Sequence, residues 1–213
     1  MSTRVVIADD HGAIRAGLRL VLVAADDIEV VAEAGDGEVA IRQARALRPD
    51  VVLMDVRMPG MDGIAATQAI TAEGLSQVLI LTTFDVDEYV FGALRAGAAG
   101  FLLKTVEPAA LIDAVRRVAA GDGVIAPEVT RRVLNTFTHA APAPVLAPEL
   151  DSLTGRERDI LAALGRGLSN ADIAAEFTIS EATAKTHVSR VLSKLGCTSR
   201  VQAAIIAKEA GLA

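Results

Sequence analysis

VVLMDVRMPGMDG, residues 51–63, runs from four apolar residues directly into a carboxylate, that of Asp55. A short apolar run bounded by turn-forming residues is typical of a strand that is buried on both faces. An aspartate that directly follows such a strand is most often a turn residue or a helix cap. Whether Asp55 does more than this depends on which residues end the other strands of the same sheet.

Apolar runs and helical segments alternate on both sides of this stretch, from residue 4 to about residue 119. Strict alternation of strand and helix indicates βαβ units, and therefore a parallel sheet with helices on both faces. We predict a doubly wound α/β domain with five strands over residues 1–121. Residues 122–152 are expected to hold a helix at 126–138 and then a semi-rigid linker, because Pro142, Pro144 and Pro148 disfavour regular structure.

Four of the five predicted strands end in residues that suit a cation and a phosphoryl group. In strand order these residues are Asp9 and Asp10, Asp55, Thr82 and Thr83, and Lys104. Since binding sites in open parallel sheets form outside the carboxyl ends of the strands, we expect these side chains to converge. Neighbouring carboxylates repel one another unless a cation neutralises them, and Mg²⁺ prefers such oxygen ligands. A lysine on the far side could hold a phosphate.

The chain from Leu153 onward is helical in pattern throughout. Thr154 and Glu157 form a capping-box motif, and Ser180 can cap a long amphipathic run that Gly196 ends. We therefore predict a small all-α domain of four helices over residues 153–213, with a helix-turn-helix at its centre. From periodicity alone, a small helical bundle that docks another protein fits this pattern equally well.

Composition and charge limit the class of protein. The 213 residues are 52% hydrophobic, which suits two ordinary domains with aliphatic cores. No apolar run reaches the roughly 18 residues of a membrane span, and the N-terminus lacks the features of a signal peptide, so we expect no membrane partner. The single cysteine fits a reducing, cytoplasmic location. Residues 1–121 carry 11 Lys and Arg against 17 Asp and Glu, whereas the remainder is balanced and locally basic between residues 185 and 200.

Four segments in this order closely resemble the receiver domain of two-component response regulators, which has a flavodoxin-like fold. They are IADDH (7–11), LMDVRMPGMDG (53–63), LTT (81–83) and GAAGFLLK (97–104). The resemblance implies that Asp55 accepts a phosphoryl group from a sensor histidine kinase. The implied Mg²⁺ ligands are Asp9, Asp10, Asp55 and the backbone carbonyl of Arg57. The implied phosphoryl-stabilising and switch residues are Thr82, Lys104 and Phe101.

Residues 153 to about 211 closely resemble the LuxR-type DNA-binding domain, and the whole chain resembles the NarL/FixJ arrangement of receiver, linker and LuxR-type domain. The resemblance implies a transcription regulator that dimerises on activation and binds two-fold operators in double-stranded DNA. The final helix, around Ala203 to Ala207, is the expected pairing surface. The residues expected to face base edges are Lys185, Thr186 and Ser189, and those expected to meet phosphates are His187 and Arg190.

Two other functions account for part of the sequence. An enzyme with an aspartyl-phosphate intermediate usually shows D-x-D-x-T after the strand, whereas this chain reads DVRMP, so we expect no enzyme. An atypical receiver that binds DNA irrespective of phosphate would lack acyl phosphate on Asp55. The sequence leaves open whether the inactive form masks its recognition helix or is merely monomeric, and whether the Lys104–Thr105 peptide is cis.

Overall fold

Parallel strands and helices alternate along the first part of the chain, as predicted. The computed structural model describes residues 2–83, 87–125 and 150–213. The strands are β1 (Thr3–Ala8), β2 (Ile28–Ala34), β3 (Val51–Met54), β4 (Gln77–Thr82), β5 (Gly100–Leu103) and β6 (Val124–Ile125). The helices between them are α1 (Gly12–Val23), α2 (Gly37–Leu47), α3 (Gly63–Ala72), α4 (Asp87–Arg95) and α5 (Pro108–Ala119). Together they form the α/β domain.

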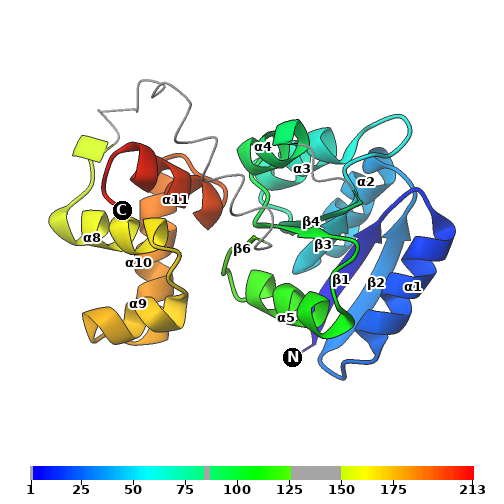
Figure 1. The fold of residues 1–213 in the computed structure, drawn as a ribbon, viewed down its shortest axis with the longest axis horizontal. Coiled ribbons are helices and arrows are strands. Elements are labelled where there is room, and N and C mark those ends of the chain that lie inside the picture. Colours follow the sequence, from blue (N-terminus) through cyan, green and yellow to red (C-terminus); the bar gives the residue numbers. More distant parts are fainter. Residues whose placement is uncertain (1, 84–86, 126–149) are drawn as a thin grey trace.

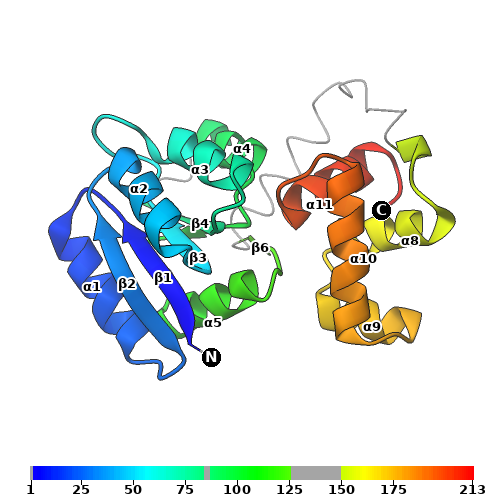
Figure 2. The ribbon, with the colours of Figure 1, turned by 180° about the vertical axis from the view of Figure 1, so that it is seen from behind.

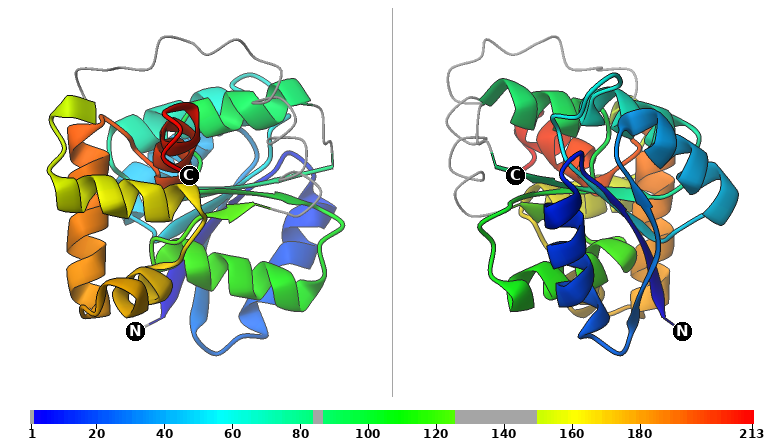
Figure 3. Two further views of the ribbon diagram at one scale, coloured as in Figure 1. Left: turned by 60° about the vertical axis from the view of Figure 1, so that its left-hand side comes forward. Right: turned by 90° about the vertical axis from the view of Figure 1, so that its right-hand side faces the viewer.

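The sheet is parallel and has the order β2-β1-β3-β4-β5-β6. Helices α2, α3 and α4 lie on one face and α1 and α5 on the other, as Figures 1 and 3 show. The five predicted strands are confirmed, but the sheet gains a sixth, β6, from the segment that was expected to hold only helix and linker. Val124 pairs with Gly100 in this strand. Two residues are too few to show an alternating pattern, so strand β6 could not be predicted from the sequence.

The loop after β3 folds back tightly on the strand. All four residues of β3 are buried, and the backbone N–H of Asp55 continues the ladder by donating to Ala8 O at 2.8 Å. Gly63 then returns to the strand end, where its N–H donates to Val56 O at 2.9 Å. A Cβ at position 63 would lie 1.9 Å from the Asp55 carbonyl oxygen, so this approach requires glycine.

The helical domain contains α8 (Gly155–Gly165), α9 (Asn170–Phe177), α10 (Glu181–Lys194) and α11 (Arg200–Glu209). The predicted capping box of Thr154 and Glu157 is confirmed at the start of α8. Ser180 caps α10 by accepting a hydrogen bond from Thr183 N, as predicted. Gly196 follows the end of α10 with a φ of 63°, a left-handed conformation that favours glycine.

Two predictions fall outside the described residues: the helix at 126–138 and the proline-containing linker. The Lys104–Thr105 peptide, which the sequence left open, is trans. Among the described helices, none combines the length and the apolar character needed to cross a membrane.

Glu157 connects two helices of the helical domain through an ion pair. Its Oε2 lies 2.6 Å from Nζ of Lys194 on α10, and this Nζ also donates to Ser152 O. The hydrogen bond from Lys194, together with that from Thr154 N, lowers the pKa of Glu157 to about 2. The ionised carboxylate therefore stabilises the folded domain, and this contribution is lost as pH falls below the ordinary range of a glutamate.

We expect Glu157→Gln to lower the melting temperature of the helical domain by a few degrees at pH 7. The difference from the wild type should shrink as pH falls from about 4.3 towards 2, because the wild-type carboxylate becomes protonated there. Thermal unfolding followed by circular dichroism measures this. Glu181→Gln, which removes only an exposed pair with Lys185, is the control. Equal melting temperatures of wild type and Glu157→Gln at pH 7 would contradict the assignment.

Candidate functional site

The strand ends bring predicted acidic and basic side chains together at one edge of the sheet. Asp9 follows β1, Asp55 follows β3, and Lys104 follows β5. The two aspartates are 1% and 6% exposed, and the Lys104 side chain is 10% exposed. Lys104 Nζ lies 2.5 Å from Asp9 Oδ2 and 3.1 Å from Asp55 Oδ2. One lysine therefore bridges two buried carboxylates from neighbouring strands.

Backbone hydrogen bonds fix where these side chains leave the sheet. Asp9 N donates to Ala34 O at 3.1 Å, and Lys104 N donates to Thr82 O at 2.8 Å. Together with the bond from Asp55 N, they continue the ladder one residue beyond each strand. The register of the sheet, rather than the loops, therefore sets the mutual positions of the three charged groups.

The charges around Asp55 are not fully balanced. Burial is the largest effect and raises the pKa of Asp55, and the negative charge of Asp9 acts in the same direction. Lys104 and the N–H of Val56, which donates to Asp55 Oδ1 at 2.9 Å, lower the pKa but do not cancel the rise. The site therefore holds an excess of negative charge in a poorly solvated position.

Asp10 and His11 extend this acidic site towards solvent. Asp9, Asp10 and His11 each offer one ligand atom, and these atoms all lie within 4.8 Å of one another. His11 Nδ1 lies 2.6 Å from Asp10 Oδ1, and His11 N donates to Asp9 Oδ1 at 2.9 Å. The structure thus groups His11 with the first two predicted ligands, while the oxygen of Asp55 faces Lys104. His11 precedes α1 as its N-cap, and its place directly after Asp9 and Asp10 in the sequence is the signal that points to it.

The buried carboxylates fit a hard cation. Asp9 Oδ2 accepts no hydrogen bond of ordinary geometry from a described group, although Lys104 Nζ is in ionic contact with it. Lys104 thus supplies one positive charge to two buried carboxylates, and a cation with oxygen ligands would complete the charge balance.

A cleft of about 550 Å³ opens beside the charged cluster. The residues that line it are Asp10, His11, Ile14, Asp55, Arg57, Met58, Pro59, Thr83 and Lys104. Thr82 is buried at the end of β4, one residue before the cleft-lining Thr83. Phe101 is fully buried on β5 and pairs with Ile80 of β4. The predicted switch residues thus occupy neighbouring strands beneath the cleft.

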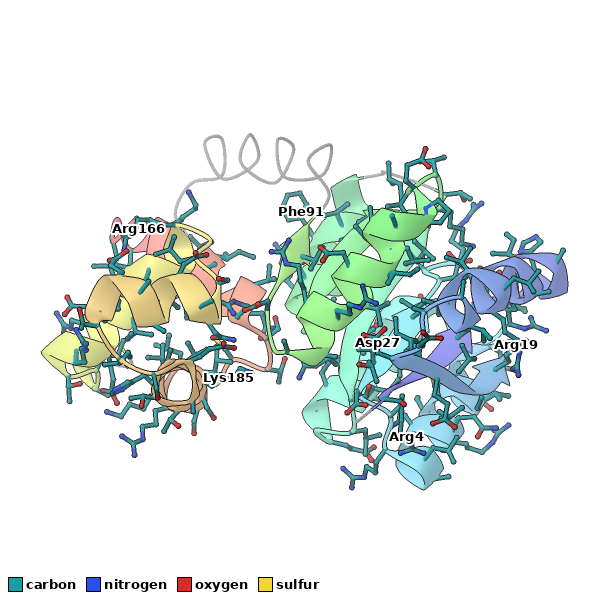
Figure 4. The ribbon with its side chains drawn as sticks, turned by 90° about the horizontal axis from the view of Figure 1, so that it is seen from below. Arg4, Arg19, Asp27, Phe91, Arg166 and Lys185 are labelled. Atoms are coloured by element: carbon teal, nitrogen blue, oxygen red, sulfur yellow. The ribbon has the colours of Figure 1, made fainter. Side chains whose placement is uncertain are left out.

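The predicted DNA-contacting residues lie on α10, whose apolar stripe packs into the helical domain. Ala184, Val188 and Val191 are buried in that domain. Lys185, Thr186, Ser189 and Arg190 are exposed, and His187 is half-buried. Figure 2 shows α10 along one side of the domain, and Figure 4 marks Lys185. The described residues of the α/β domain do not cover this face of α10.

The two domains meet instead at α11. Arg200, at its start, is 9% exposed and lies with Nη1 2.6 Å from Asp122 Oδ1 of the α/β domain. The same guanidinium donates to the carbonyls of Gly121 and Leu168, so it ties the end of the α/β domain to the α8–α9 turn. Gln202 adds a hydrogen bond to Arg95 O at the end of α4, beside which α11 lies in Figure 1. We call this contact the domain latch.

Two residues of the predicted pairing surface lie in the core of the helical domain. Ala203 and Ala207 are fully buried inside the helical domain, where α11 packs against α8. These two side chains are therefore unavailable for pairing, whereas Ala204, Ile205 and Ile206 between them are partly exposed. Pairing through the final helix stays a prediction. Val201 and Ile205, on another face of α11, pack against the core of the α/β domain. Small residues on a helix suit either a core or a pairing surface, so the sequence alone could not assign Ala203 and Ala207 to the core.

Comparison with protein families matches residues 5–116 to the response regulator receiver domain and residues 151–207 to the luxR family of bacterial regulatory proteins. The transcriptional regulatory protein LiaR of Bacillus subtilis (strain 168) is 42% identical over 206 residues, which cover 96% of each chain. The response regulator protein VraR of Staphylococcus aureus (strain NCTC 8325 / PS 47) is 41% identical over 209 residues, which cover 97% of each chain.

Similar solved structures are also response regulators or their receiver domains. The response regulator ChrA of a heme-sensing two-component system is 42% identical, with a TM-score of 0.56, and the match covers 100% of this chain and 99% of that one. The receiver domain of NarL from Mycobacterium tuberculosis is 40% identical, with a TM-score of 0.55, over 56% of this chain and 98% of that one. The chain therefore belongs to the DNA-binding response regulators of two-component systems, which join a receiver domain to a LuxR-type helix-turn-helix domain.

Proposed function

We propose that this response regulator is controlled by phosphorylation of Asp55, which takes the phosphoryl group from the phosphohistidine of a sensor histidine kinase. The observation that carries this proposal is the position of Asp55, a buried carboxylate that lines the cleft and lies 3.1 Å from Lys104. A carboxylate oxygen of Asp55 would bond to phosphorus as the bond from phosphorus to the histidine nitrogen breaks. The imidazole leaves with the bonding electrons, so the chain acts as an acceptor and not as an enzyme.

The groups around Asp55 support this role. Asp9, Asp10, Asp55 and the backbone carbonyl of Arg57 would hold Mg²⁺, which supplies positive charge to the phosphoryl oxygens when bound. Lys104 would move from the carboxylates to a phosphoryl oxygen as a point charge. Thr82 would bond another phosphoryl oxygen, and Phe101 would change its rotamer with it.

Asp55→Asn should abolish phosphate incorporation from a small phosphodonor in the presence of Mg²⁺, while the domain stays folded. Asp50→Asn is the matched control, since Asp50 is an exposed carboxylate at the opposite end of β3. Intact-protein mass spectrometry measures the acyl phosphate. Full incorporation by Asp55→Asn, or loss of incorporation in Asp50→Asn alone, would refute the assignment.

For DNA, we propose that Lys185, Thr186 and Ser189 contact base edges in the major groove and that His187 and Arg190 contact phosphates. The exposure of four of these residues on one side of α10 supports this arrangement. The ion pair of Lys185 with Glu181, at 3.4 Å on the surface, is weak enough to exchange for DNA.

Lys185→Ala should weaken binding to an operator selected from random DNA by about 1 to 3 kcal/mol and relax the preference at one base position. Arg190→Ala should weaken binding to all DNA sequences equally and reduce the slope of the salt dependence of binding by about one. Titrations at several salt concentrations, with Lys208→Ala as an exposed control on α11, separate the two effects. Identical changes in specificity for both variants would mean that the groove-facing side is misassigned.

We further propose that the latch couples the two domains. While Arg200 is paired with Asp122, the helical domain is held against its own α/β domain and cannot settle freely on a two-fold operator. Phosphorylation would shift an existing equilibrium towards the undocked form, which dimerises on DNA. The exposed α10 face favours this account over masking of the recognition helix.

Asp122→Asn should loosen the latch because it removes the negative charge that Arg200 faces. We expect roughly tenfold tighter operator binding without a phosphodonor, which corresponds to about 1.4 kcal/mol lost from the docked form. Asp27→Asn is the control, because it breaks an ion pair of the same length, with Arg116, within the α/β domain. Unchanged affinity for Asp122→Asn would exclude the latch as a restraint on DNA binding.

A further inference from the structure

Arg15 of α1 lies behind the acidic loop, outside the residues that line the cleft. Its Nη1 donates to the backbone carbonyl of Asp9 at 2.6 Å, and its Nε donates to Glu33 Oε2 on β2 at 3.2 Å. The guanidinium is packed between two glycines: a Cβ at Gly12 would lie 3.6 Å from Nη2, and one at Gly35 would lie 3.9 Å from Nη1. One side chain thus joins the start of α1, the end of β2 and the loop that carries Asp9.

We propose that Arg15 is a positioning residue for the cation site, an inference that rests on the proposed Mg²⁺ binding. The last ladder bond of this loop is that from Asp9 N, and beyond it the Asp9–Asp10 peptide is held at its carbonyl by Arg15. Since a peptide unit is planar, fixing this carbonyl also fixes the direction in which Asp10 leaves the loop. Arg15 therefore keeps the two carboxylates aimed at one point, as groups behind metal ligands commonly do.

Because Arg15 is positively charged, its effect on Mg²⁺ affinity through positioning and its effect through charge have opposite signs. A guanidinium close to a cation site repels the cation, and the pair with Glu33 offsets that repulsion. On charge alone, removing Arg15 would take away a repelling positive charge, leave Glu33 paired only with Arg19, and strengthen Mg²⁺ binding. If Arg15 positions the carboxylates, its removal weakens Mg²⁺ binding instead. The sign of the change therefore decides between the two roles.

Arg19 provides a matched control one turn along the same helix. Its Nη1 lies 3.5 Å from Glu33 Oε1, so it shares the partner of Arg15 and carries the same charge. Its side chain is 53% exposed, against 22% for Arg15, and Figure 4 shows it at the end of the α/β domain far from the helical domain. Arg19→Ala therefore reports the effect of losing a positive charge from the Glu33 pair.

The experiment is isothermal titration of the full chain with MgCl₂ alone. Arg15→Ala should weaken Mg²⁺ binding about tenfold or more, whereas Arg19→Ala should leave it unchanged or slightly tighter. Arg15→Lys should fall between Arg15→Ala and the wild type, because a single ammonium cannot reproduce the fork of the guanidinium. Circular dichroism checks that each variant is folded, and Arg15→Lys decides the outcome if Arg15→Ala is not.

Unchanged or tighter Mg²⁺ binding by folded Arg15→Ala would overturn the proposal. If only Arg15→Lys folds, a Mg²⁺ affinity of that variant equal to that of the wild type would also overturn the proposal. Absence of Mg²⁺ binding by the wild type would overturn the proposed cation site together with this inference. Mg²⁺ binding by the wild type with no effect of Arg15 would overturn this inference alone.

Discussion

The sharing of one lysine between two buried carboxylates is the constraint on which the site depends. The order of the sheet places β1 beside β3, so Asp9 and Asp55 emerge next to each other, and Lys104 reaches both from β5. Neither aspartate can relax into solvent, and one positive charge does not balance two negative ones. A bound cation would complete the charge balance. Under the proposed phosphorylation, a phosphoryl group on Asp55 would draw Lys104 to itself, so the same imbalance would make the site respond to it.

The strand that precedes Lys104 also leads to the second domain. Lys104 follows β5, and β5 pairs with β6, which begins two residues after Asp122 of the latch. A shift of Lys104 and Phe101 would therefore act on the part of the sheet that adjoins Arg200. The acidic site and the interface with α11 are separate in space but share one pair of strands, which gives the proposed coupling a physical route.

Local patterns in the sequence predicted much of this structure, and long-range contacts account for what they missed. The buried run 51–54, the charged strand ends and the caps at Thr154 and Ser180 each depend on a few neighbouring residues, so their consequences could be read directly. The pair of Arg200 with Asp122 spans 78 residues and has no periodic signature. The contact of Arg15 with the Asp9 carbonyl could not be predicted from the sequence either, because an arginine on an amphipathic helix usually faces solvent.

The titration of Asp55, followed through its carboxyl ¹³C resonance by NMR with and without Mg²⁺, tests the central constraint most directly. The account predicts a pKa above the value of about 3.9 that is usual for aspartate when Mg²⁺ is absent, and a fall in that pKa when Mg²⁺ is added. An Asp55 pKa at or below the usual value that does not respond to Mg²⁺ would contradict it, since Lys104 would then balance the site without help.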